Sequence, residues 1–222
     1  PNAVFGPFNN PMMGTEASKP TGMDFMQLLI GVPYAFKLND NHAFGIMPFA
    51  AVQAMKVYGL EPFTPFSEDP QNVTGNGYSY SYGGGLRVGW FGKFGDRVGA
   101  GVSYQTTGWM SEFEDYAGLM AEQGDMDIPA TLIGGVSFKL NDRLTTVFDI
   151  QHIWYSDVSS IGNAHDTPFF GMTPDGQMYP RTLLGSDEGI GFGWKDMTIA
   201  KFGLQWDYAS DLTLRAGYSF AD

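Results

Sequence analysis

The chain has 222 residues, of which 43% are hydrophobic, 15% aromatic and only 16% charged, with 30 glycines, no cysteine and a net charge of -12. The lack of cysteine excludes a disulfide scaffold and a thiolate metal site, and the negative charge argues against nucleic acid as a partner. No run of 18 apolar residues occurs, so the sequence contains no candidate transmembrane helix.

Eight strand-like runs follow an N-terminal loop, and each alternates apolar with polar or small residues. In the run that ends near Asp207, Phe202, Leu204 and Trp206 share one face and Lys201 lies on the other. A period of two places successive side chains on opposite faces of a strand. Runs of about 10 residues or more are long enough for tilted strands to cross a bilayer. The runs are 23–37, 43–58, 77–92, 97–110, 128–140, 143–157, 195–207 and 212–222.

The connections between these runs alternate between short and long. The short ones carry Asn, Asp, Ser or Gly, which suit tight turns. Long loops at 1–22, 59–76, 111–127 and 158–194 hold 14 acidic and 2 basic residues, so they carry the whole net charge. Tight turns at one end and long loops at the other are typical of outer-membrane barrels. The sequence therefore predicts an all-β, transmembrane, antiparallel β-barrel with long acidic outer loops.

Some positions inside the runs do not suit regular strands. Pro33 and Pro48 each remove a backbone donor, which predicts a kink, a bulge or an edge. The triple glycine 83–85 predicts a bend or a close approach of another backbone. Apolar residues of the first two runs are expected to face lipid: Leu28, Ile30, Val32, Tyr34, Phe44, Ile46 and Val52.

The opposite face of the runs is expected to line the lumen. Its first part is unusually apolar, which indicates an oily lumen rather than a water-filled pore. Charges also face inward, and Asp149 and Lys201 are expected at similar height on neighbouring strands. These charges form either a network of ion pairs or a cationic anchor for a carboxylate ligand. The facing pattern selects these lumen candidates: Met47, Phe49, Met55, Arg87, Asp149, Lys201 and Arg215.

The loop 111–127 has apolar residues at helical spacing between acidic ones, which predicts a short amphipathic helix. Its apolar side either caps the barrel or forms a groove for an apolar ligand. Residues 122–127 match no Ca²⁺-binding loop, so we expect no metal site beyond adventitious divalent binding.

Catalytic signatures are lacking, since the sequence has neither G-x-S-x-G nor H-E-x-x-H. The three histidines, His42, His152 and His165, are scattered over a turn, a strand and a loop. We therefore expect no enzyme and no cofactor, and an outer-membrane hydrolase is the least supported class.

Three segments, 113–129, 148–163 and 193–220, resemble the FadL-type outer-membrane transporters of long-chain fatty acids. The similarity runs in order over most of the chain. It implies a barrel of about fourteen strands plugged by an N-terminal hatch, of which this chain supplies about eight strands. It also implies that substrate binds between outer loops, moves to a lumen pocket and leaves sideways through a strand kink. The hatch, the early strands and the last strands are missing, so we expect residues 1–222 to be an internal part of one longer barrel domain.

The resemblance implies an outer groove formed by the loops 59–76 and 111–127. Its candidate lining is Phe63, Phe66, Phe113, Tyr116, Leu119 and Met120. The expected function is passive uptake of long-chain fatty acids or related hydrophobic molecules across a bacterial outer membrane, with hydrophobic small molecules and outer-membrane lipids as partners. The alternative is a small barrel with a structural or surface-interaction role. The oligomeric state stays open.

Overall fold

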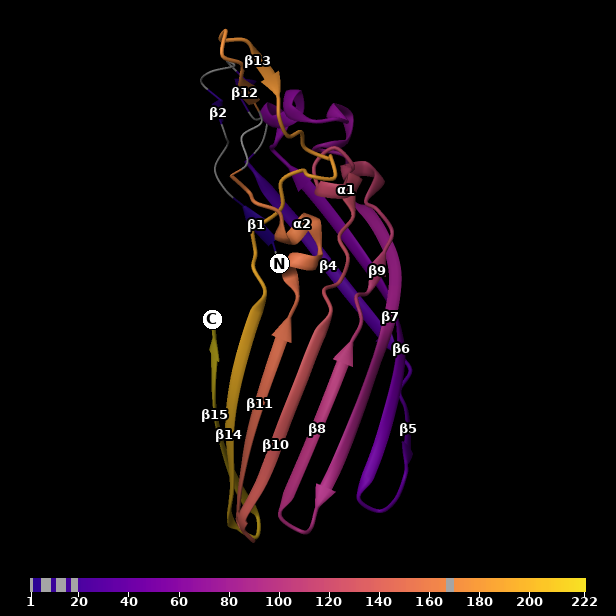
Figure 1. Ribbon diagram of the computed structural model, residues 1–222, viewed down its shortest axis with the longest axis vertical. Coiled ribbons are helices and arrows are strands. Elements are labelled where there is room, and N and C mark those ends of the chain that lie inside the picture. The colour runs from indigo at the N-terminus through magenta and orange to yellow at the C-terminus, as the bar shows by residue number, and fades with distance from the viewer. Residues whose placement is uncertain (1, 5–8, 11–14, 17–19, 167–169) are drawn as a thin grey trace.

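The computed structural model describes residues 2–4, 9–10, 15–16, 20–166 and 170–222, so much of the predicted loop 1–22 lies outside the described residues. One eleven-stranded antiparallel sheet dominates the structure (Figure 1). Its strand order is β1-β4-β6-β7-β8-β10-β11-β14-β15, and β5 and β9 pair with β6 and β7. Strands that follow one another in the chain therefore mostly lie side by side, as in an up-and-down barrel wall.

The predicted strands are confirmed, but the runs 23–37 and 97–110 are each divided into two strands, and residues 155–157 at the end of the run 143–157 form a helical turn. The long strands are β4 (Gly22–Gly31), β5 (Tyr34–Lys37), β6 (His42–Tyr58), β7 (Ser79–Phe94), β8 (Val98–Gln105), β10 (Thr131–Asn141), β11 (Leu144–Ile153), β14 (Met197–Ala209) and β15 (Leu212–Ala221). Shorter strands are β1 (Asn2–Val4), β2 (Asn9–Asn10), β3 (Thr15–Glu16), β9 (Trp109–Met110), β12 (Phe170–Met172) and β13 (Met178–Pro180). The strands β1, β2 and β3 and the β12–β13 hairpin lie in segments predicted to be loops, because two or three residues give no visible alternation.

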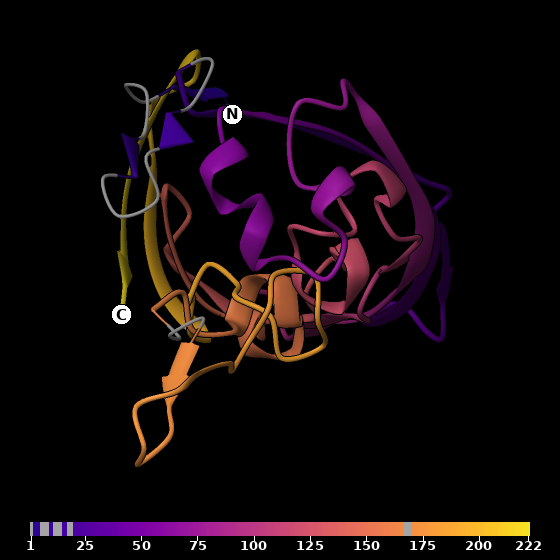
Figure 2. The same cartoon turned by 90° about the horizontal axis from the view of Figure 1, so that it is seen from above.

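Among the described residues, five of the six helical turns lie in the long loops, and the sixth ends the predicted run 143–157. They are η1 (Glu61–Phe66), η2 (Pro70–Asn72), η3 (Glu114–Tyr116), α1 (Ala121–Gly124), η4 (Tyr155–Asp157) and α2 (Ser159–Gly162). The helix expected over 111–127 is not continuous: the loop forms the short turns η3 and α1, and within α1 itself Glu122 and Gln123 adopt positive φ values of 54°. Seen from above, the sheet curves around a central space and helical turns lie within the curve (Figure 2). Among the described residues, no helix is long and apolar enough to cross a membrane.

The outer face of the sheet carries a broad apolar band. Leu28 and Ile30 on β4 are 58% and 61% exposed, and Tyr218 and Phe220 on β15 are 71% and 60% exposed. A continuous face that exposes many large aromatic and aliphatic side chains requires an apolar environment. This face meets the expectation of a lipid-facing surface.

Aromatic contacts lie near both ends of the strands. Trp90 contacts His42 and Phe94 near the tight turns. Trp154 contacts Tyr104 where the strands meet the long loops. Two aromatic girdles of this kind mark the two interfaces of a membrane barrel.

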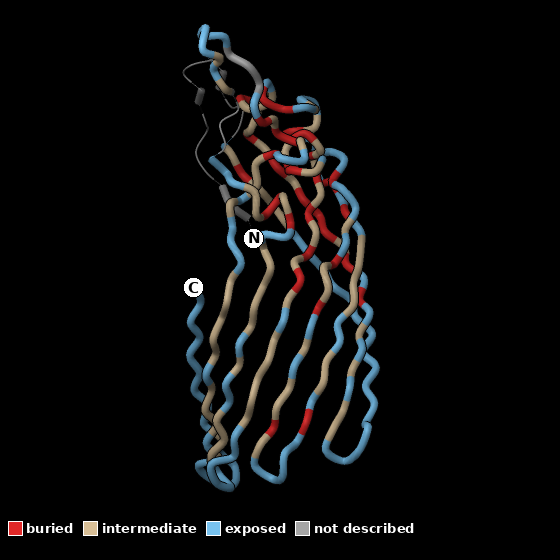
Figure 3. The backbone as a smooth tube through the Cα atoms, viewed as in Figure 1, coloured by how far each residue is buried: buried red, intermediate tan, exposed pale blue. Residues whose placement is uncertain are grey.

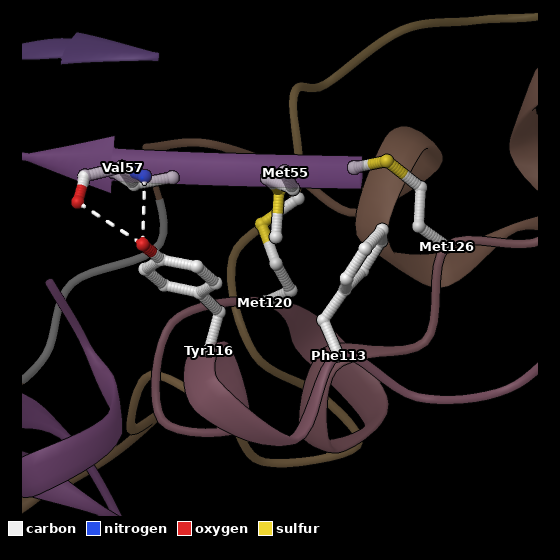
Figure 4. Packing of buried hydrophobic residues seen from close by; sticks show 6 residues of the cluster. All are labelled: Met55, Val57, Phe113, Tyr116, Met120 and Met126. Atoms are coloured by element: carbon white, nitrogen blue, oxygen red, sulfur yellow. Dashed lines mark hydrogen bonds between the residues drawn. The ribbon is translucent and has the colours of Figure 1, made fainter. Parts of the chain in front are cut away.

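Most buried residues gather at the loop end, as Figure 3 shows, while the strands toward the tight turns are exposed or half-buried apart from Gly92 and Gly99. A sheet that turns one face to lipid cannot form a core between two layers. Its compact core therefore forms where the long loops fold over the strand ends. Figure 4 shows this outer core, which consists of Met55, Val57, Phe113, Tyr116, Met120 and Met126.

The sheet is interrupted between β4 and β5, opposite Pro48 on β6. β4 and β5 share one register against β6, since Gly31 pairs with Phe49 and Tyr34 with Ile46. Between them, Val32 donates its N–H to the Pro48 carbonyl at 3.1 Å. Pro48 cannot donate in return, so this position has half its usual ladder bonds. The strand β6 itself continues through Pro48.

The glycine run on β7 permits a close approach of neighbouring backbones, as predicted. A Cβ on Gly83 would lie inside van der Waals contact of the Trp109 carbonyl and 2.7 Å from Met110 Cα. A Cβ on Gly85 would lie 2.7 Å from the ring of Phe49. The register also shifts by one residue between the β7–β8 and β7–β9 pairs, so a bulge brings this backbone close.

We predict that Gly83→Ala lowers the free energy of unfolding by about 2 kcal/mol or more, because the added methyl group meets rigid backbone. The matched control is Gly134→Ala on β10, where a Cβ meets nothing within 4 Å. The control should change stability by less than about 1 kcal/mol. Urea unfolding in lipid vesicles, followed by tryptophan fluorescence, measures both; equal losses would contradict the close approach.

Candidate functional site

The floor of the outer site is fixed by one buried hydroxyl. Tyr116 Oη accepts the N–H of Val57 at 3.0 Å and donates to the Gly77 carbonyl at 2.6 Å. These bonds join the loop 111–127 to the end of β6 and to the segment before β7. Phe113 and Tyr116 are fully buried below the surface. These two predicted groove residues therefore form the base of the site and do not line an open groove.

An apolar pocket of about 260 Å³ lies above this base. Four parts of the chain meet there: the start of β4, the end of β6 with Leu60, the loop 111–127 and the loop 158–194. Leu119 and Met120, two further predicted groove residues, line it, whereas Phe63 and Phe66 lie in η1 and are not among its lining residues. The lining is Thr21, Gly22, Met23, Val57, Leu60, Leu119, Met120, Ser160, Ile190, Gly191 and Phe192.

This outer pocket is chemically simple. None of the described residues that line it carries a charge. The hydroxyl of Thr21 donates to the Gly59 carbonyl at 3.0 Å, so it is already used within the protein. A site of this kind binds through apolar contact and offers no ion pair to an anionic ligand.

A second buried apolar cluster lies on the inner face of the sheet. Phe49, Ala51 and Ile128 form this cluster, with Met110 packed against it. The Phe49 ring covers the bare backbones of Gly85 and Gly108. Met55, a predicted lumen residue, belongs to the outer core and is fully buried. The apolar inner-face residues Phe49 and Met55 are thus packed in buried clusters.

A hollow of about 560 Å³ lies further toward the tight turns. Glycine, alanine and serine residues make most of its wall, together with Phe91 and Ile133. Asp149 is the one charged residue among the described lining residues, and its carboxylate lies against Gly135. This hollow has room for a small molecule but presents no cation to it.

The inward cations bond to glutamines. Lys201 Nζ donates to Gln151 Oε1 at 2.7 Å, and Arg215 Nε donates to Gln205 Oε1 at 3.0 Å. Arg87 makes the same kind of bond to Gln105, and Met47 is its cross-strand neighbour. Asp149 and Lys201 are register partners, as predicted, yet no ion pair joins these two described side chains. The ion pair considered between them does not form, because Lys201 reaches diagonally to the next residue pair.

Two acidic side chains meet where the loop 111–127 enters the wall. Asp127 accepts the N–H of Met110 at 2.6 Å. Burial, together with the nearby charge of Asp127, raises the pKa of Asp125 to about 7. Burial also raises the pKa of Asp127. Sequence analysis had considered residues 122–127 for cation binding; no group of metal-ligating side chains occurs among the described residues.

Several solved structures have a fold similar to that of this chain. The Pseudomonas putida toluene transporter TodX is 18% identical over 100% of this chain and 62% of its own, with a TM-score of 0.64. The Ralstonia pickettii toluene transporter TbuX is 14% identical over 94% of this chain and 59% of its own, with a TM-score of 0.61. A Pseudomonas aeruginosa FadL homologue is 16% identical over 90% of this chain and 50% of its own, with a TM-score of 0.56.

These likenesses show the fold, which is that of the FadL-type transport barrels. The chain spans about three fifths of the length of the first of these structures. No protein-family model matches the sequence, and no curated protein matches it.

We predict a pH dependence that arises from Asp125. Its pKa in the folded protein is raised, so the folded state holds a proton that the unfolded chain has released. The contribution of Asp125 to stability is therefore most favourable below about pH 4 and becomes less favourable as the pH rises toward about 7. Asp125→Asn should match the native protein in thermal stability near pH 4 and exceed it increasingly up to about pH 7.

Thermal unfolding of both proteins between pH 4 and pH 8 measures this difference. The matched control is Asp115→Asn, at an exposed carboxylate of the same loop. A difference between Asp125→Asn and the native protein that does not change with pH would contradict the prediction.

Proposed function

We propose that this chain forms part of an outer-membrane channel for the passive uptake of hydrophobic small molecules. The observation that carries the proposal is the uncharged apolar pocket at the loop end, which lies above a partly apolar lumen. The apolar outer face of the sheet supports a position in a membrane, and long loops of such barrels face outward.

Burial of apolar surface would drive the transfer. Each buried CH₂ group contributes roughly 0.8 kcal/mol, so an apolar molecule gains by leaving water for the outer pocket. The Phe49 cluster would delay its passage, and the hollow below would receive it. None of these steps needs covalent chemistry.

The solved structures of similar fold support a channel over an enzyme. TodX and TbuX are described as toluene transporters, and CymD as a monoaromatic hydrocarbon channel. The identities are low and the chain spans only part of those proteins, so the activity of the whole protein is inferred from the pocket as well.

Long-chain fatty acids are the second candidate substrate, and one observation favours them. Lys201 and Arg215 face inward and bond to neutral glutamines, which leave their charges uncompensated by those partners. Such cations could anchor a carboxylate head group. Against this candidate, the outer pocket has no charged lining residue and the hollow has only Asp149.

Filling the outer pocket tests the proposed function. Leu119→Trp should lower toluene uptake by about tenfold, because the indole occupies the space that the ligand needs. The matched control is Leu214→Trp on the outer face, where Leu214 is 47% exposed and the larger ring meets the surroundings. Uptake of labelled toluene by cells carrying each variant is the measurement, and equal uptake in all three proteins would refute capture at this pocket.

Removing the inward cations tests the choice of substrate. If neutral hydrocarbons are the substrate, the double variant Lys201→Ala and Arg215→Ala shows the same ratio of toluene uptake to laurate uptake as the native protein, because neither ligand uses these cations. A selective loss of laurate uptake, by about tenfold, would instead establish the carboxylate anchor.

A further inference from the structure

One polar side chain in the outer pocket has no partner. Ser160, on α2, is 1% exposed and lines the pocket. Its Oγ makes no hydrogen bond to any described residue. A buried hydroxyl without a partner is costly, so such groups are rare and call for a physical explanation.

The backbone holds Ser160 in place. Phe192 donates its N–H to the Ser160 carbonyl at 3.3 Å, and Trp194 donates to the Ile161 carbonyl at 3.0 Å. Gly191 packs so tightly against α2 that a Cβ there would lie 2.6 Å from the Ser159 carbonyl oxygen. These contacts fix the backbone of this helical turn against the loop. A rotation of the Ser160 side chain alone would then bring its buried hydroxyl to a ligand in the pocket, without any movement of the backbone.

The surroundings define what this hydroxyl could bind. Thr21, the other hydroxyl in the pocket, already donates to Gly59, and no described lining residue is charged. We propose that the outer pocket selects neutral hydrophobic molecules that carry one hydroxyl group, such as phenols, and that Ser160 binds this hydroxyl. A serine hydroxyl both donates and accepts, so it can pair with a phenol in either direction.

The size of the pocket limits the ligand to about one ring. A cavity of about 150 Å³ holds benzene, and drug-sized ligands use about 300 Å³ or more. The 260 Å³ of this pocket lies between these limits. A ring with one hydroxyl and one or two small alkyl groups fits it.

This inference deepens the proposed function and rests on it. An apolar pocket alone discriminates poorly between molecules of similar shape. A site whose buried polar group is left unpaired by the wrong ligand discriminates much more strongly. Ser160 would thus add selectivity to a capture step that burial of apolar surface drives.

The test compares p-cresol with toluene, which differ by one hydroxyl. Isothermal titration calorimetry on the full-length protein in detergent gives both affinities, and the Leu119→Trp variant supplies the background from partition into micelles. Water solvates p-cresol better than toluene, so the measured quantity is the ratio of the two affinities. This ratio should fall about tenfold in Ser160→Ala and less in Ser160→Cys, whose thiol is a weaker hydrogen-bonding group.

The adjacent variant Ser159→Ala is the matched control and should keep the native ratio. Ser160→Ala removes only a hydroxyl that lacks a partner, so it should fold, and thermal unfolding checks this. An unchanged ratio in Ser160→Ala would overturn the inference while leaving capture at the pocket intact. Binding of both ligands at the level of Leu119→Trp would overturn the proposed capture step and the inference with it.

Discussion

The hydroxyl of Tyr116 is the contact on which the outer half of the molecule depends. It bonds to Val57 at the end of β6 and to Gly77 before β7, and it holds the loop 111–127 down on the strand ends. A sheet with one face toward lipid has no second layer to pack against. Buried contacts between loops and strand ends are therefore what gives the site its shape, and the pocket above Met120 follows from them.

The strands could be predicted from the sequence because their chemistry repeats. Alternation marks each long strand, and the same physical rule that orients Leu28 and Ile30 outward also exposes Tyr218 and Phe220. The effect of Pro48 could be predicted because a missing N–H has the same consequence in any sheet. The short strand β1 and the β12–β13 hairpin could not, because their pairing depends on partners distant in space.

The binding site could be predicted only in outline. Helical spacing marked Phe113 and Tyr116 as apolar, but it cannot distinguish a residue that lines a pocket from one that supports it. Spacing also suggested the pairing of Asp149 with Lys201, whereas side-chain reach decides that Lys201 bonds to Gln151. Ser160 carried no signal, since a single serine in a loop forms no pattern. The glycines between Gly189 and Gly193, beside Phe192 and Trp194, were the one hint of close packing there.

In the proposed function, the outer pocket captures the molecule and the lumen receives it. The described residues that line the pocket carry no charge and include one unpartnered hydroxyl, and the inner face of the sheet has a buried apolar cluster at Phe49 and a separate hollow. Under this proposal, burial of apolar surface favours the outer pocket over water, and Ser160 would recognise a polar group there. The inward cations Lys201 and Arg215 do not line the outer pocket, so they would act on a ligand only after it has left that pocket.

The most direct test of the central claim is a crystal structure of the native protein, purified from its own membrane and soaked with 4-bromotoluene. The anomalous signal of bromine locates the ligand without prior assumption. The account predicts a bromine site between Met120 and Phe192, in the pocket at the loop end. Bromine found only in the lumen or on the outer face of the sheet would contradict it.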